Sequence, residues 1–293
     1  MSSSESIRRR IAFGRVNRRL PDQLAFDRRP FVDDMRILAE SRETRAEADD
    51  REWVAADLTL DSSGDFMTGV LGFVESELRR DFEDEAFSWL KGRTDTAEGA
   101  TRRTVSPFAV DLREDRRWVA FAVTSRIQPT TFRRGFSVAL NAAVLRLNLW
   151  PSEWEVDLVL QKRTVQEWIA EHGEVFYFRR KVKLTNPGRE IEEDRAEMRA
   201  LAARSKEETF KASYGRTLRL QDSEEFIRKL DGVETGDLEV FLRARGPEGS
   251  EFVFTSDEQP EHTFVPDFGD NLDEGIDRVL DALREYSERR AAS

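Results

Sequence analysis

The 293-residue sequence contains no cysteine and only two histidines. The absence of cysteine excludes disulfide bonds, thiolate zinc sites, iron–sulfur clusters and a cysteine nucleophile. The two histidines, His172 and His262, lie far apart in the sequence, which argues against a metal site assembled from several imidazoles. We therefore predict no metal and no cofactor.

Long hydrophobic runs are also missing. No stretch of about 18 apolar residues occurs, and no apolar segment follows the N-terminal "MSSSESIRRR", so we expect a cytoplasmic protein with no membrane association. Phosphate-binding glycine loops and the motifs of serine and zinc hydrolases are absent as well. We therefore predict no catalytic residue, and the sequence favours a binding protein over an enzyme.

Acidic residues outnumber basic ones, and the net charge is −11. A surface of this sign repels nucleic acid and anionic membranes as a whole. Any binding of nucleic acid must therefore use a local basic patch. The hydrophobic fraction of 39% is large enough to build a core in a chain of this length.

Hydrophobic periodicity predicts an α+β fold with a mixed, largely antiparallel sheet and packed helices. Apolar residues alternate over 53–60 and 66–74 on either side of a "DSSGD" turn, which indicates a hairpin. Helical spacing appears over 132–147 and again near the C-terminus. The alternation of strands and helices over 117–184 suits a ferredoxin-like unit.

Composition divides the chain into three segments. Residues 1–51 are highly charged, and we expect a basic and charged N-terminal arm ahead of the core. We assign residues 52–185 to an α+β domain or subdomain and residues 186–293 to an α+β C-terminal subdomain. The turn "TNPG" marks the boundary between these two.

The stretch "VFYFRRKVKLTNPG", residues 175–188, places four cations in an apolar strand. Alternation assigns one face to the core and gives the opposite face a row of candidate nucleic-acid-binding residues, namely Tyr177, Arg179, Lys181 and Lys183. These cations stand about 6.6 Å apart, twice the strand rise, and the tyrosine could stack on a base. The alternative is a solvent face whose cations pair with neighbouring acids. Arg180 falls on the core row and must lie at an edge, snorkel or pair with a carboxylate.

A second basic feature lies in the N-terminal arm, where "SIRRRIAFGRVNRRL" interleaves cations with apolar residues. This composition suits a segment that orders on nucleic acid or on an acidic partner. The alternative is a helix that packs on its own domain. The candidate nucleic-acid-binding residues of this arm are Arg8, Arg9, Arg10, Arg15, Arg18 and Arg19.

Two further classes of protein stay open. A Mg²⁺-dependent nuclease would use the carboxylates of Glu155 and Asp157 with Lys162 nearby, although the carboxylate–x–lysine spacing of restriction-type nucleases is missing. A structural subunit of a larger assembly would expose an apolar patch larger than about 600 Å². Oligomeric state is not predicted.

The segments "SPFAVDLREDRRWVAFAVTSRIQPTTFRRGFSVALNAAV" and "KVKLTNPGREIEEDRAEMRALAARSKEETFKAS" belong to a region covering about half of the chain that resembles uncharacterised bacterial proteins of mobile-element or phage-defence neighbourhoods. The shared features are a strand, an Asn-Pro turn, a charged helix and a "TFKA" strand. The resemblance implies a defence-associated accessory protein and carries no site residues. We therefore expect a non-catalytic binding protein of a prokaryotic defence or mobile-element system that contacts nucleic acid or a protein partner.

Overall fold

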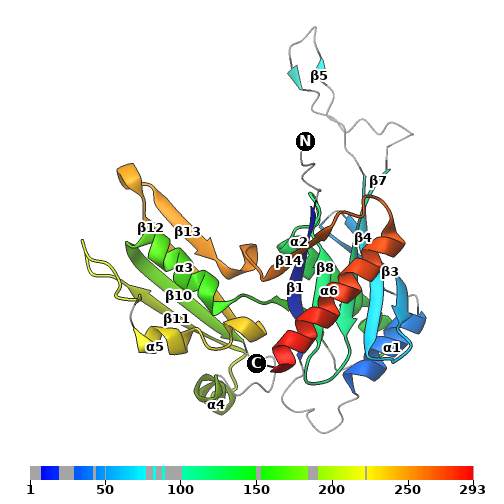
Figure 1. Ribbon diagram of the computed structural model, residues 1–293, viewed down its shortest axis with the longest axis horizontal. Helices are drawn as coiled ribbons and strands as arrows, with labels where there is room; N and C mark the ends of the chain where they lie inside the picture. The colour runs from blue at the N-terminus through cyan, green and yellow to red at the C-terminus, as the bar shows by residue number, and fades with distance from the viewer. Residues whose placement is uncertain are drawn as a thin grey trace, which may run out of the picture.

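The computed structural model shows two lobes, each built on an antiparallel sheet (Figure 1). Every strand pairing between described residues is antiparallel, and helices pack on the sheets, so the predicted α+β class is confirmed. The structure describes residues 8–19, 30–41, 44–49, 51–76, 82–83, 88–89, 101–149, 153–183, 191–221 and 223–292.

The first lobe contains the larger sheet, with the strand order β14-β1-β8-β7-β4-β3-β2 and with β9 also paired to β1. The predicted hairpin around "DSSGD" is confirmed as β3 and β4. The elements of this lobe are β1 (Arg8–Arg19), α1 (Phe31–Ser41), β2 (Arg45–Ala48), β3 (Arg51–Leu60), β4 (Phe66–Ser76), β7 (Thr101–Asp111), β8 (Trp118–Ala122), α2 (Pro129–Arg146), β9 (Glu153–Leu158), β14 (His262–Pro266) and α6 (Leu272–Ala292). A separate two-stranded pairing joins β5 (Phe82–Glu83) and β6 (Ser88–Trp89).

Strand β1 corrects the expectation of an N-terminal arm. It lies inside the first sheet, where it pairs with β14, β8 and β9. Its two faces are both buried: Ala12 and Val16 join the core under α1 and α2, and Ile11 and Phe13 join the core under α6. Apolar residues on both faces remove the simple alternation that identifies a strand, which is why the charged flanks dominated the prediction.

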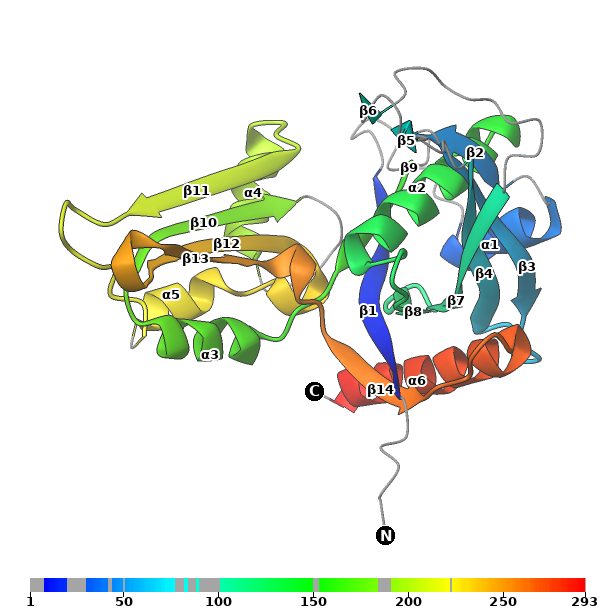
Figure 2. The same cartoon turned by 90° about the horizontal axis from the view of Figure 1, so that it is seen from above.

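Helices α2 and α6 cover opposite faces of the first sheet (Figure 2). On the α2 side, Gly135 makes room for the indole ring of Trp53, because a Cβ atom at residue 135 would lie 2.2 Å from that ring. On the other side, Tyr286 of α6 stacks on Phe13, with ring centroids 4.1 Å apart. Both helices are thus fixed by close aromatic packing.

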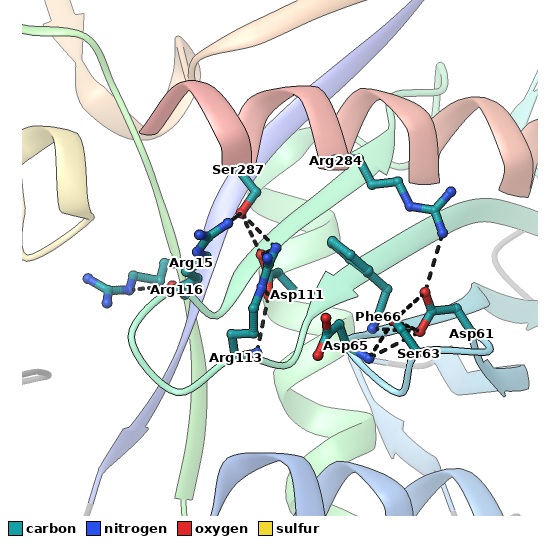
Figure 3. Close-up of polar contacts among 10 residues, drawn as sticks. All are labelled: Arg15, Asp61, Ser63, Asp65, Phe66, Asp111, Arg113, Arg116, Arg284 and Ser287. Atoms are coloured by element: carbon teal, nitrogen blue, oxygen red, sulfur yellow. Dashed lines mark hydrogen bonds and ion pairs between the residues drawn. The ribbon is translucent and has the colours of Figure 1, made fainter. Parts of the chain in front are cut away.

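Polar contacts fasten α6 to two turns of the same sheet (Figure 3). The hydroxyl of Ser287 donates a hydrogen bond to the fully buried carboxylate of Asp111, which also pairs with Arg113. One helical turn away, Arg284 reaches the carboxylate of Asp61 at 3.3 Å. That carboxylate also accepts hydrogen bonds from the Asp65 and Phe66 amides in the β3–β4 turn, so the turn and α6 hold each other in place.

The second lobe comprises residues 162–255 and contains the four-stranded sheet with the order β11-β10-β12-β13. Three helices pack on one face of this sheet through a second hydrophobic core. The elements are α3 (Lys162–His172), β10 (Val175–Lys183), α4 (Glu192–Ala200), β11 (Ser205–Lys211), α5 (Glu224–Lys229), β12 (Leu238–Arg245) and β13 (Glu251–Thr255).

The division between the lobes differs from the predicted boundary at 185–186. Strand β10 lies before this point and pairs with β11 and β12, which lie after it. Instead, the chain crosses between the lobes at residues 159–161 and 256–261, where the Glu261 amide donates to the Val159 carbonyl at 2.7 Å. The ferredoxin-like unit expected over 117–184 is not formed, because β8 and β9 pair with β1 whereas β10 belongs to the second sheet.

Candidate nucleic-acid interface

From Tyr177 onward the side chains of β10 separate into two rows, as its alternation predicts, whereas a register shift between Val175 and Tyr177 places Val175 in the core. Phe178 and Val182 of one row are buried against the helices of the second lobe. Arg180 lies in the same row and is only 5% exposed. Its guanidinium pairs with Glu208 at 2.6 Å and with Asp194 at 3.0 Å. Of the roles considered for Arg180, carboxylate pairing is the one the structure shows, and β10 is an inner strand.

The other row of β10 faces away from the helices of the second lobe. Tyr177, Arg179 and Lys181 are all half-buried. The register of the antiparallel strands brings further side chains onto the same face, which we call the open face. No described helix of the second lobe covers it (Figure 2). Its members are Lys211, Thr209 and Glu207 on β11, Tyr177, Arg179 and Lys181 on β10, Arg243, Phe241 and Glu239 on β12, and Val253 and Thr255 on β13.

Two aromatic rings form the centre of the open face. Tyr177 of β10 and Phe241 of β12 meet edge to face, with ring centroids 5.8 Å apart. The guanidinium of Arg179 lies over the Phe241 ring at 5.1 Å, and Lys211 lies 6.0 Å from the Tyr177 ring. Cations therefore flank an aromatic pair on the two inner strands.

Ion pairs on the open face agree with the alternative interpretation, in which the cations pair with acids on neighbouring strands. Arg179 lies 4.0 Å from Glu207, and Lys181 lies 3.9 Å from Glu239. The Arg179 and Lys181 side chains nevertheless stay 43% and 42% exposed. Exposed pairs contribute about 0 to 1 kcal/mol, so a phosphate group can replace either carboxylate at little cost.

Lys183 does not join this surface. Its side chain is 8% exposed, and its ammonium group contacts Asp157 at 2.7 Å and Glu239 at 2.6 Å. Burial alone would lower the pKa of Lys183, but the two carboxylates outweigh burial and raise it. The prediction that Lys183 lies on an exposed face is wrong, because the end of β10 docks against β9 of the first lobe.

One of the two candidate nuclease carboxylates is buried and paired within the protein. Asp157 is 1% exposed and accepts a hydrogen bond from Asn17 at 2.5 Å in addition to its contact with Lys183. The Asp157 carboxylate therefore already has charged and hydrogen-bonding partners within the protein. Among the residues that the structure describes, no group of three or more acidic or histidine side chains could hold a metal ion. Glu155 lies two residues before Asp157 on β9 and is half-buried.

Three of the N-terminal arginines contact side chains of their own lobe. Arg9 pairs with Asp267 at 2.7 Å, Arg18 pairs with Asp34 at 2.6 Å, and Arg10 donates to Gln128. The structure leaves Arg8 exposed, and the Arg19 side chain lies outside the described residues. These arginines thus belong to a strand of the first sheet and not to an arm, and nucleic-acid binding by them stays a prediction.

Arg15 is buried, at 8% exposure. Its guanidinium donates to the carbonyls of Asp115 and Arg116, both at 2.9 Å, and lies over the Trp118 ring. Burial lowers the pKa of Arg15, with partial compensation by Asp237 of the second lobe. Arg15 thus holds the loop between β7 and β8 of its own lobe.

Sequence reasoning missed the part of the open face that lies on β12. Phe241 and Arg243 belong to "DLEVFLRAR", whose alternation predicts a strand but not its neighbour. The pairing of β10 with β12 joins residues more than 50 positions apart, so the aromatic pair could not be recognised without the register. The repeated aromatic-plus-cation alternation in both strands was the available signal.

Comparisons with known proteins provide no family. No protein-family model matches the chain, and no curated protein sequence matches it. In the described part of the chain, no helix is long and apolar enough to cross a lipid bilayer.

Proposed function

We propose that the protein binds single-stranded nucleic acid on the open face of its second lobe. In this proposal Tyr177 and Phe241 stack on bases, and Arg179 and Lys181 contact phosphates. The observation that supports the proposal best is the aromatic pair on the two inner strands of a sheet whose other face carries the helices. Aromatic side chains in this arrangement recognise single-stranded RNA in RNA-recognition motifs.

Single strands fit the open face better than duplexes for two reasons. Stacking on Tyr177 and Phe241 requires unpaired bases, because the base faces of a duplex are covered by their neighbours. The surface also has mixed charge, so it lacks the continuous basic patch with which duplex-binding proteins neutralise many phosphates. Stacking is therefore expected to supply much of the affinity.

We further propose that the protein is a cytoplasmic, non-catalytic accessory component of a prokaryotic defence or mobile-element system. This part of the proposal depends on the resemblance of the two segments described above. The genes that lie beside this one in different genomes test it. Recurrent defence or transposition genes would support the assignment, whereas unrelated metabolic neighbours would contradict it.

The binding proposal is tested with fluorescein-labelled 12-nucleotide single strands of RNA and DNA and with a duplex of the same sequence. Fluorescence anisotropy at several salt concentrations should show binding of the single strands that weakens as salt rises. Phe241→Ala should raise Kd by about 5-fold to 150-fold, the loss expected for one stacked base.

Phe252→Ala provides the matched control. Phe252 is a half-exposed phenylalanine of the same sheet, but its ring contacts His172 of α3 on the helix-covered face. This variant should bind as the wild type does. No binding of any oligonucleotide at low salt would refute the proposal, and a protein partner would then become the leading candidate.

A further inference from the structure

A cleft of about 800 Å³ lies between the two lobes. Its walls come from β3, α2 and β9 of the first lobe and from β10 and β12 of the second. Ligand-binding clefts in proteins commonly have volumes of about 300 to 1,000 Å³. Lys181 and Glu239 belong both to the cleft and to the open face, so the two surfaces are continuous.

Cationic side chains outnumber acidic ones around the cleft. Its acidic members are Asp49, Glu155 and Glu239. The lining of the cleft therefore carries net positive charge, although the net charge of the whole chain is −11. The cationic members are Arg51, Arg133, Arg134, Lys181 and Lys183.

The arginines of α2 differ in how firmly the protein holds them. Arg133 contacts Asp257 at 2.7 Å and Glu239 at 3.5 Å, which fixes its guanidinium at the junction of the lobes. Arg134 pairs with Asp49, and both of these side chains are largely exposed, at 63% and 44%. An exposed pair of this kind is weak, so Arg134 can exchange the carboxylate for another anion.

The N-terminal end of α2 also suits an anion. Thr130 and Thr131 line it from the first turn of α2, an 18-residue helix whose N-cap residue makes no side-chain capping hydrogen bond. The N-terminal end of a helix carries partial positive charge and amide donors.

We propose that the interlobe cleft binds phosphate groups, with Arg134, Arg133 and Lys181 as the principal contacts. The phosphates come either from the strand that lies on the open face or from a free nucleotide. The cleft is defined by residues of both lobes, so this inference does not depend on the stacking of bases on Tyr177 and Phe241.

Isothermal titration with sodium tripolyphosphate and with ATP tests the site directly. Arg134→Ala should weaken binding of the better ligand by about tenfold or more, the effect of losing one charge-assisted hydrogen bond. Arg146→Ala is the matched control, because Arg146 is exposed on the same helix and does not line the cleft. This control should bind within twofold of the wild type.

Competition distinguishes the two sources of phosphate. If tripolyphosphate displaces a labelled oligonucleotide, and Arg134→Ala weakens the oligonucleotide as well, the strand supplies the phosphates. If tripolyphosphate and the oligonucleotide bind together, or if only tripolyphosphate or ATP binds, the cleft takes a free nucleotide. In the last case the proposed function fails while this inference stands.

One further pattern of results would contradict the phosphate site in the cleft and leave the proposed function standing. It consists of an oligonucleotide that binds with dependence on Phe241, no heat from tripolyphosphate or ATP, and unchanged oligonucleotide affinity in Arg134→Ala. Binding of tripolyphosphate that Arg134→Ala and Arg146→Ala affect equally would also overturn the assignment, because the ion would then lie elsewhere.

Discussion

Lys183→Met is the substitution that best separates structural from binding cations on β10. It keeps most of the length of the side chain but removes the ammonium group that contacts Asp157 and Glu239. Asp157 is 1% exposed, and its carboxylate contacts the side chains of Lys183 and Asn17. In the variant it loses the Lys183 contact and keeps the hydrogen bond from Asn17. Leaving one member of a buried ion pair alone typically costs about 3 to 5 kcal/mol.

The loss should fall near the lower end of this range, about 3 kcal/mol, because Glu239 is 28% exposed and can be solvated. Urea unfolding followed by tryptophan fluorescence measures the loss. The double variant Lys183→Met with Asp157→Asn should recover most of it, since no unpaired charge then remains. A loss below about 1 kcal/mol in the single variant would refute the buried pairing. So would equal losses in the single and double variants.

Two other predictions concern the packing of the lobes. The hydrogen bond from Arg180 to Glu208 lowers the pKa of Glu208 to about 2, so Glu208 stabilises the fold above about pH 4.5 and this stabilisation is lost as the pH falls toward 2. Glu208→Gln should therefore flatten the acid limb of the stability curve measured by urea unfolding between pH 7 and pH 3, and an unchanged limb would contradict this origin. Gly135→Ala should lower the Tm, because the clash with Trp53 costs about 1 to 3 kcal/mol and exceeds the gain of about 1 kcal/mol in helix propensity. A raised Tm in differential scanning calorimetry would show that the indole ring moves aside freely.

The contrast between Arg180 and Lys183 shows how far the sequence alone could lead. Alternation along β10 placed Arg180 on the buried row and required a carboxylate or an edge, and the structure supplies Glu208 and Asp194. The same alternation placed Lys183 on the outer row, where it does lie. Its burial comes from the first lobe, whose docking against this end of β10 is a tertiary contact with no local signal in the sequence.

The N-terminal strand shows a different limit. The apolar residues of β1 serve two cores at once, so they follow neither the period of a half-exposed strand nor that of an amphipathic helix. The abundant arginines around them then suggested an arm. The hairpin partners β3 and β4, by contrast, are joined by a short turn with a strong signal, and their pairing could be predicted without knowledge of the rest of the fold.

Ultraviolet cross-linking of a bound single-stranded RNA, followed by mass spectrometry of the digested protein, tests the central claim most directly. The proposal predicts adducts at Tyr177 and Phe241, lost when the two residues are replaced by leucine, and none at Phe252 of the same sheet. Adducts confined to other parts of the chain, with neither ring modified, would contradict an aromatic binding surface on the open face.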